Sequence, residues 1–129
     1  MATSLQTSNA ILSSGTDGIG YSTGAGGTVT QAGSKATGVT LDKACGAITL
    51  NNALLAAATA VTFIVTCASC VAGDLVVLAH SSAGTSGAYL LSVSAVGAGS
   101  FSITVYNATG GGLSEAIVVS FAIVKGVTA

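Results

Sequence analysis

Residues 88–108 read AYLLSVSAVGAGSFSITVYNA, and this stretch decides the fold class. Two runs of Val, Ile, Leu and aromatic residues alternate with Ser and Thr, which is typical of half-buried β-strands. Between the runs, VGAGS (96–100) supplies glycines, which adopt the positive φ angles that tight turns require. The stretch therefore predicts two strands joined as a hairpin.

Runs of the same kind lie on both sides of this hairpin, from Gly38 onward. About seven short strands at nearly regular spacing are typical of an antiparallel β-sandwich or a jelly roll. NATGGG (107–112) suits a second hairpin. We interpret NNALLAAATA (51–60) as a loop between strands, with a single helical turn as the alternative. The other runs are GVTL (38–41), AITL (47–50), AVTFIVTC (60–67), DLVVLAH (74–80) and EAIVVSFAIV (115–124).

The composition of the 129-residue chain indicates one domain with an almost uncharged surface. Only 5% of the residues are charged and the formal net charge is −1. With three lysines and no arginine, the chain is not expected to bind nucleic acid. No apolar run approaches the roughly 18–20 residues of a membrane-spanning helix, so we expect no membrane partner. A surface with so little charge opposes association weakly, which predicts a homo-oligomer.

Residues 1–37 are dominated by Ser, Thr, Gly and Ala, and we interpret them as an extended arm before a β-sandwich domain at 38–129. GYSTGAGG (20–27) has the glycine content of a phosphate-binding loop, but a strand pattern follows where such motifs open a helix. We expect residues 1–31 to lie along neighbouring subunits or the shell, with Tyr21 as their anchor and with residues 28–31 added to a sheet edge. A flexible linker is the alternative. The expected contact residues are Ile11, Leu12, Tyr21, Gly24, Gly26, Gly27, Thr28, Val29 and Gln31.

No combination of side chains predicts a catalytic, cofactor or metal site. CASC (67–70) has the spacing of a zinc or redox motif, but residues three apart on a strand face opposite ways. We therefore expect small, buried cysteines that are reduced and free of metal. An odd count of three cysteines also favours a reducing, cytosolic site of synthesis.

Asp74 and His80 are the remaining candidates for a catalytic arrangement. On a regular strand they lie about 20 Å apart, too far for a catalytic hydrogen bond. Asp74 better fits a residue that closes a turn through its carboxylate, and His80 a strand-end residue near solvent. The four acidic residues are too dispersed for a carboxylate pair or a calcium loop. We therefore predict a protein that is not an enzyme and binds no cofactor.

Two long segments resemble a family of small structural proteins of tailed bacteriophages. GYSTGAGGTVTQAGSKATGVTLDKACGAITL (20–50) resembles the opening of that family, in which Gly-Tyr-x-Thr-Gly-x-Gly-Gly-Thr-Val-Thr-Gln leads into two strands. GSFSITVYNATGGGLSEAIVVSFAIVKG (99–126) is similar to its closing pattern. The resemblance covers most of residues 18–126 and has no catalytic residues to transfer.

The resemblance implies a capsid decoration (cement) protein that binds the phage head as an oligomer and stabilises the shell. By analogy with decoration proteins it favours a trimer, the major capsid protein as partner, and a place on the capsid surface of the virion after synthesis in the host cytoplasm. Related segments occur in tail-fibre and spike proteins, so the alternative is a module that binds a host surface glycan. Tyr21, Tyr89 and Tyr106 would then stack on sugars, although the chain has no tryptophan.

Overall fold

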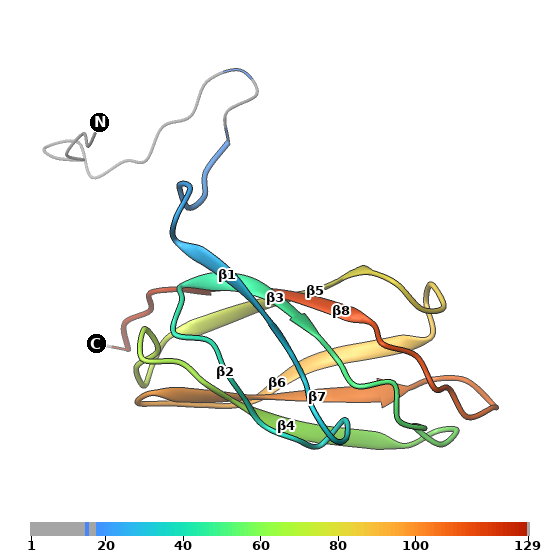
Figure 1. The fold of residues 1–129 in the computed structure, drawn as a ribbon. Coiled ribbons are helices and arrows are strands. Elements are labelled where there is room, and N and C mark those ends of the chain that lie inside the picture. Colours follow the sequence, from blue (N-terminus) through green and yellow to red (C-terminus); the bar gives the residue numbers. More distant parts are fainter. Residues whose placement is uncertain (1–14, 16–17, 129) are drawn as a thin grey trace, which may run out of the picture.

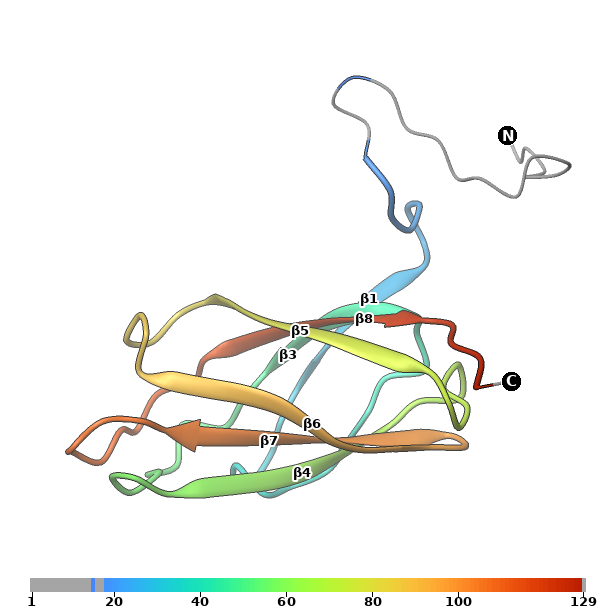
Figure 2. The ribbon, with the colours of Figure 1, turned by 180° about the vertical axis from the view of Figure 1, so that it is seen from behind.

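The computed structural model describes Gly15 and residues 18–128, and all the regular structure in them is β. The strands form two four-stranded sheets, with the order β1–β3–β8–β5 in sheet A and β2–β4–β7–β6 in sheet B. Figures 1 and 2 show the two sheets facing each other as two layers. The strands are β1 (Gly26–Thr30), β2 (Val39–Thr40), β3 (Cys45–Thr49), β4 (Ala60–Thr66), β5 (Leu75–Ser82), β6 (Tyr89–Gly97), β7 (Ser100–Asn107) and β8 (Val118–Val124).

The chain changes sheet at almost every connection. Strands β1 to β6 belong alternately to sheets A and B, and β6 and β7 are consecutive neighbours in one sheet. This pair is the predicted hairpin, with Gly97 paired to Ser100 and a φ of 80° at Gly99 in the turn. Residues 107–112 instead lead from β7 of sheet B to β8 of sheet A, so the second predicted hairpin is wrong.

Both sheets are mixed, which confirms the predicted all-β fold and corrects its antiparallel form. β1 runs parallel to β3, and β2 runs parallel to β4. The remaining pairs are antiparallel. Alternation of apolar and polar residues is the same in both kinds of pair, because it reports which face is buried and not the direction of the neighbouring strand. The sequence pattern therefore carried no signal for the parallel pairs.

The core lies between the sheets and is filled by alternate side chains of each strand. On β7, Phe101, Ile103 and Val105 are buried, whereas the residues between them are partly exposed. The ring of Phe101 contacts that of Phe121 from β8, with their centroids 5.2 Å apart. Burial of apolar area, at about 25 cal/mol per Å², is the main term that holds the two sheets together.

The folded domain begins before the boundary predicted at residue 38. β1 pairs with β3 along its whole length, and Gln31 and Lys35 are buried. The two strands approach closely at Gly46, where a Cβ atom would collide with the backbone oxygen of Gly27. The glycine-rich composition that suggested an arm thus belongs in part to a strand of sheet A. The predicted loop at 51–60 is confirmed up to Thr59, with one isolated bridge, Leu55 to Leu113.

Candidate assembly surface

The charged side chains of the described residues all lie outside the strands. They are Lys35, Asp42, Lys43, Asp74, Glu115 and Lys125. The positions of β1 to β8 that face away from the core therefore carry uncharged side chains, mostly Gly, Ala, Ser, Thr and aliphatic residues. On sheet B the outward hydroxyls bond to one another, as in the 2.7 Å contact between Thr62 Oγ1 and Thr104 Oγ1. Neither sheet offers charge to a partner.

Buried polar side chains hold one end of the molecule, which we call the Lys35 end. The Lys35 ammonium donates hydrogen bonds to the backbone oxygens of Asn51 and Glu115, the second at 2.7 Å. Burial lowers the pKa of Lys35, and the Glu115 carboxylate opposes this effect. The side-chain amide of Gln31 donates to the carbonyls of Lys35 and Thr37 at 2.9 and 2.7 Å and accepts from Asn51 N–H at 3.0 Å. Gln31 is buried, and these bonds tie its amide to its own subunit. Its expected contact with a neighbouring subunit stays a prediction.

Glu115 accepts three further hydrogen bonds at the same end. Its carboxylate accepts from the backbone N–H and the hydroxyl of Thr85, at 3.0 and 2.6 Å, and from the Tyr89 hydroxyl at 2.8 Å. These bonds lower the pKa of Glu115, and the bonds from Thr85 have the largest effect. Burial and the bond to Glu115 in turn raise the pKa of Tyr89. Tyr89 is therefore a buried, hydrogen-bonded residue, and its ring is not available to stack on a sugar.

The opposite end, which we call the Asp74 end, depends on an ion pair and on turns. Asp74 Oδ2 accepts from the backbone N–H of Val71 at 3.0 Å and from Lys125 Nζ at 2.8 Å. The first contact confirms the predicted role of Asp74 in closing the turn before β5. The hydrogen bond from Lys125, followed by that from Val71, lowers the pKa of Asp74.

CASC (67–70) forms a turn after β4, where Cys70 N–H donates to Cys67 O at 3.1 Å. The expectation of opposite strand faces is thus wrong, since both residues are buried in the core. Their predicted burial is confirmed, and all three cysteines are free thiols, with Cys45 partly buried on β3. Burial raises the pKa of Cys70, which makes its thiol a poor nucleophile.

His80 takes part in no catalytic arrangement with Asp74. Asp74 precedes β5 at one end, whereas His80 lies near the other end of this strand. The His80 Nε2 atom is 2.7 Å from the carbonyl oxygen of Ala83, and the ring meets that of Tyr89 edge-on at 5.8 Å. Across Gly15 and residues 18–128, no group of three or more His, Cys, Asp or Glu side chains is placed to hold a metal ion.

Exposed aliphatic side chains gather on the outer face of sheet A, close to the Asp74 end. Leu75 of β5 pairs with Val124 of β8, and Val77 follows two residues later on the same face. Sequence reasoning assigned this segment to a strand and missed its exposed face. The signal was present, because LVVLA has apolar residues at consecutive positions, whereas a strand with one buried face alternates.

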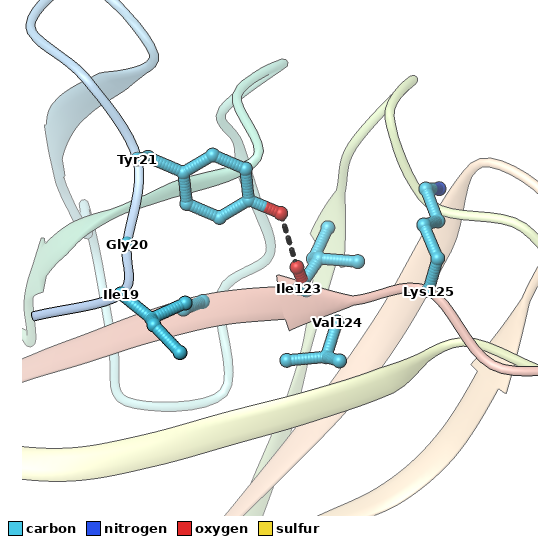
Figure 3. A pocket seen from close by; sticks show the side chains of 7 residues that line it. Ile19, Gly20, Tyr21, Ile123, Val124 and Lys125 are labelled. Atoms are coloured by element: carbon cyan, nitrogen blue, oxygen red, sulfur yellow. Dashed lines mark hydrogen bonds between the residues drawn. The ribbon is translucent and has the colours of Figure 1, made fainter. Parts of the chain in front are cut away.

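Residues 19–21 lie against the end of β8 and extend this apolar surface (Figure 3). The Tyr21 hydroxyl donates to the backbone oxygen of Ile123, while half of the residue remains exposed. Residues 19–21 and 122–125 line a groove of about 340 Å³. We name the exposed residues of this region the β5–β8 patch. It consists of Ile19, Tyr21, Leu75, Val77 and Val124.

The other residues expected to contact neighbouring subunits fall into three groups: a turn, strand β1 and residues outside the described part of the chain. Gly24 lies in an exposed turn with a φ of 97°. Gly26, Gly27, Thr28 and Val29 belong to β1, at the edge of sheet A opposite β5. Ile11 and Leu12 lie outside the described residues. Tyr21 anchors residues 19–21 to their own subunit, and its contact with a neighbour stays a prediction.

The described residues include no helix of the length and apolarity needed to cross a membrane. No family model, curated protein or solved structure matches the chain.

Proposed function

We propose that this protein is a non-enzymatic structural subunit of a bacteriophage head. In this role it is a decoration (cement) protein that binds the major capsid protein on the capsid surface as a homo-oligomer, with a trimer as the favoured form, and stabilises the shell. The observation that carries the proposal is the distribution of charge. Both sheets present uncharged faces, while charged groups such as Lys35 and Glu115 are engaged within the subunit.

Uncharged faces suit a protein that works in lasting contact with its neighbours. Net charge and surface charge keep monomers apart in solution, and this chain has little of either. An enzyme or a nucleic-acid-binding protein needs charged or titratable groups at its site. In the described residues, five of the six charged side chains make hydrogen bonds to backbone or side-chain groups of the same chain, and none of the six belongs to a strand.

The placement of the resembling segments supports a phage structural protein. Residues 20–50 contain β1, β2 and β3, and residues 99–126 contain β7 and β8. Of these strands, β1, β3 and β8 are consecutive neighbours in sheet A, whereas β2 and β7 belong to sheet B and are separated by β4. Two segments that are far apart in the sequence, and that resemble the same family, therefore meet in sheet A.

The proposal extends to the architecture. We propose that the two facing sheets are a β-sandwich with a jelly-roll-like layout. Eight strands in two four-stranded sheets around one core support it. The two parallel pairs, β1 with β3 and β2 with β4, are departures from a fully antiparallel jelly roll.

The alternative, a tail-fibre module that binds a host glycan, has less support. Tyr89 is buried and bonded to Glu115, which leaves Tyr21 and Tyr106 of the three candidate tyrosines. Tyr21 is also engaged with Ile123. Tyr106 lies on the outer face of β7, beside Leu90 and Ala60.

The test is binding to phage heads assembled without this protein. Purified protein is mixed with such heads, the heads are sedimented, and the bound copies are counted. We expect saturable binding, density on the head surface in electron microscopy, and heads that resist heating better. Heads that already carry the protein are the control, because their sites are occupied. The proposal would be overturned if the protein failed to bind heads assembled without it, or if its density appeared on the tail alone.

A further inference from the structure

We infer that the β5–β8 patch and the free edge of β5 form a contact with a second copy of this chain. This inference rests on the proposed homo-oligomer and adds the surface through which copies associate. Because the same surface of both copies takes part, the contact is two-fold and predicts an even number of subunits, which departs from the trimer that the resemblance favours.

The first observation is an unprotected strand edge. β5 is the last strand of sheet A and pairs with β8 on one side. Figure 2 shows β5 along the near side of the molecule, with no segment outside it in its own layer. Edge strands of monomeric proteins usually carry a lysine, a proline or a bulge that prevents pairing with another chain. LVVLAHSS (75–82) has no lysine and no proline, and its bulge lies at one end, between His80 and Ser82. Residues 75–79 therefore have no strand hydrogen-bonded at their outer edge, which lies near β6 of the facing sheet.

The second observation is the apolar face beside this edge. Leu75 is 61% exposed, Val77 57% and Val124 50%. Leu75 and Val124 are directly paired across β5 and β8, and Ile19 lies over the same end of β8. Single exposed aliphatic residues are ordinary, but a contiguous group is typical of an interaction site.

The absence of charge on the patch favours another copy of this chain as its occupant. None of its five residues is charged, and Lys125 at its margin is paired with Asp74. The patch has no charged group that could form an ion pair with a charged partner. Two identical uncharged faces, in contrast, can approach each other without electrostatic repulsion. A second copy also brings the same unpaired strand edge, whose N–H and C=O groups satisfy those of β5. Both features of the surface are thus complemented by the chain itself.

The experiment compares two lysine substitutions on opposite sheets. Val77→Lys places a charge in the patch, and Ile64→Lys places one at a similar position on the outer face of β4. Val77 and Ile64 are matched, with exposures of 57% and 53% in the middle of a strand. We measure molar mass by light scattering and sedimentation over a range of concentrations. We expect the wild-type protein to be an oligomer, V77K to raise its dissociation constant at least about tenfold, and I64K to change it less than about twofold.

A second pair of variants covers the case in which lysine disturbs folding. Val77→Thr and Ile64→Thr keep a β-branched shape and remove apolar area. We expect V77T to weaken association and I64T to leave it unchanged, with both proteins folded by circular dichroism.

Each outcome decides the inference separately from the proposed function. If V77K and I64K affect association equally, or if I64K alone weakens it, the contact lies elsewhere and the inference is wrong. A wild-type protein that stays monomeric at all concentrations also overturns it. Binding to phage heads is measured independently, so the proposed decoration of the capsid stands or fails on that result alone.

Discussion

The two ends of the molecule are held together by different means. At the Lys35 end, buried polar side chains bond to the backbone of several loops, and the groups are satisfied within one chain. At the Asp74 end, Lys125 reaches Asp74 from the surface with 61% of its side chain exposed. The exposed residues Leu75, Val124 and Tyr21 also lie near this second end. The comparison indicates that the Lys35 end satisfies its own polar groups, whereas the Asp74 end leaves apolar side chains exposed, where we propose that another copy binds.

Asn107 is the residue on which the Lys35 end depends most. It is fully buried at the end of β7, and its Nδ2 donates to the carbonyls of Leu55, Ala56 and Gly111 at 3.0, 3.2 and 2.9 Å. Its Oδ1 accepts from the N–H and the hydroxyl of Thr109 at 2.9 and 2.7 Å. One side chain thus joins two loops that are distant in the sequence.

The largest effect is therefore expected for Asn107→Ala. This change leaves buried carbonyls without a donor and creates a cavity, so we expect it to lower the free energy of unfolding by about 3 kcal/mol or more. Urea denaturation measures the loss. Asn52→Ala is the matched control, because Asn52 is exposed in the nearby loop, and it should change stability by less than about 0.5 kcal/mol. Equal losses in the two variants would contradict the role assigned to Asn107.

The sequence predicted most strands well and the loops only in part, for physical reasons. Strands such as β4 and β7 follow from alternation, because each residue reports its own burial. β1 was missed as part of the domain because its glycines, which permit its close approach to β3, look like those of a linker. The contact of Lys35 with Glu115 joins residues 80 apart, and no local pattern encodes it.

The candidate surface was predicted only in part. Tyr21 was selected from its residue type, and the structure places it within the β5–β8 patch. Leu75 and Val77 were not selected, since an apolar strand residue is usually interpreted as core. Their exposure depends on which strand lies at the sheet edge, and this is a property of the topology. Asp74 was assigned correctly because a turn-closing aspartate acts on residues close in sequence.

A smaller effect is expected for Cys67→Ala, which tests the Asp74 end. The Cys67 thiol is buried and donates to the carbonyl oxygen of Lys43 at 3.1 Å. Its removal leaves a small cavity and one unsatisfied carbonyl, so we expect a loss of about 1–2 kcal/mol in urea denaturation. Cys45→Ala, at a partly exposed position of β3, serves as control and should cost less than about 0.5 kcal/mol. If C67A proves more costly than N107A, the ends do not differ in the way described.

The smallest effect is the change of the melting temperature with pH and salt. It depends on one carboxylate at each end, Glu115 at the Lys35 end and Asp74 at the Asp74 end. The pKa of Glu115 lies below its ordinary 4.5 and that of Asp74 below its ordinary 3.8. A lowered pKa means that each group stabilises the folded state above its ordinary value, and that this contribution is lost as the pH falls through the lowered pKa. We therefore expect the melting temperature to fall below about pH 4, and Glu115→Gln and Asp74→Asn each to flatten this fall.

Salt distinguishes the two variants because the partners differ. Asp74 pairs with an exposed ammonium, whose attraction is screened within about 10 Å at 0.1 M salt. Glu115 is held first by hydrogen bonds from Thr85, which salt screens little. In melting curves between about pH 2.5 and 7, we expect about 0.5 M salt to reduce the difference between D74N and the wild type and to leave that of E115Q nearly unchanged. The same response to salt in both variants would show that the two ends are stabilised alike.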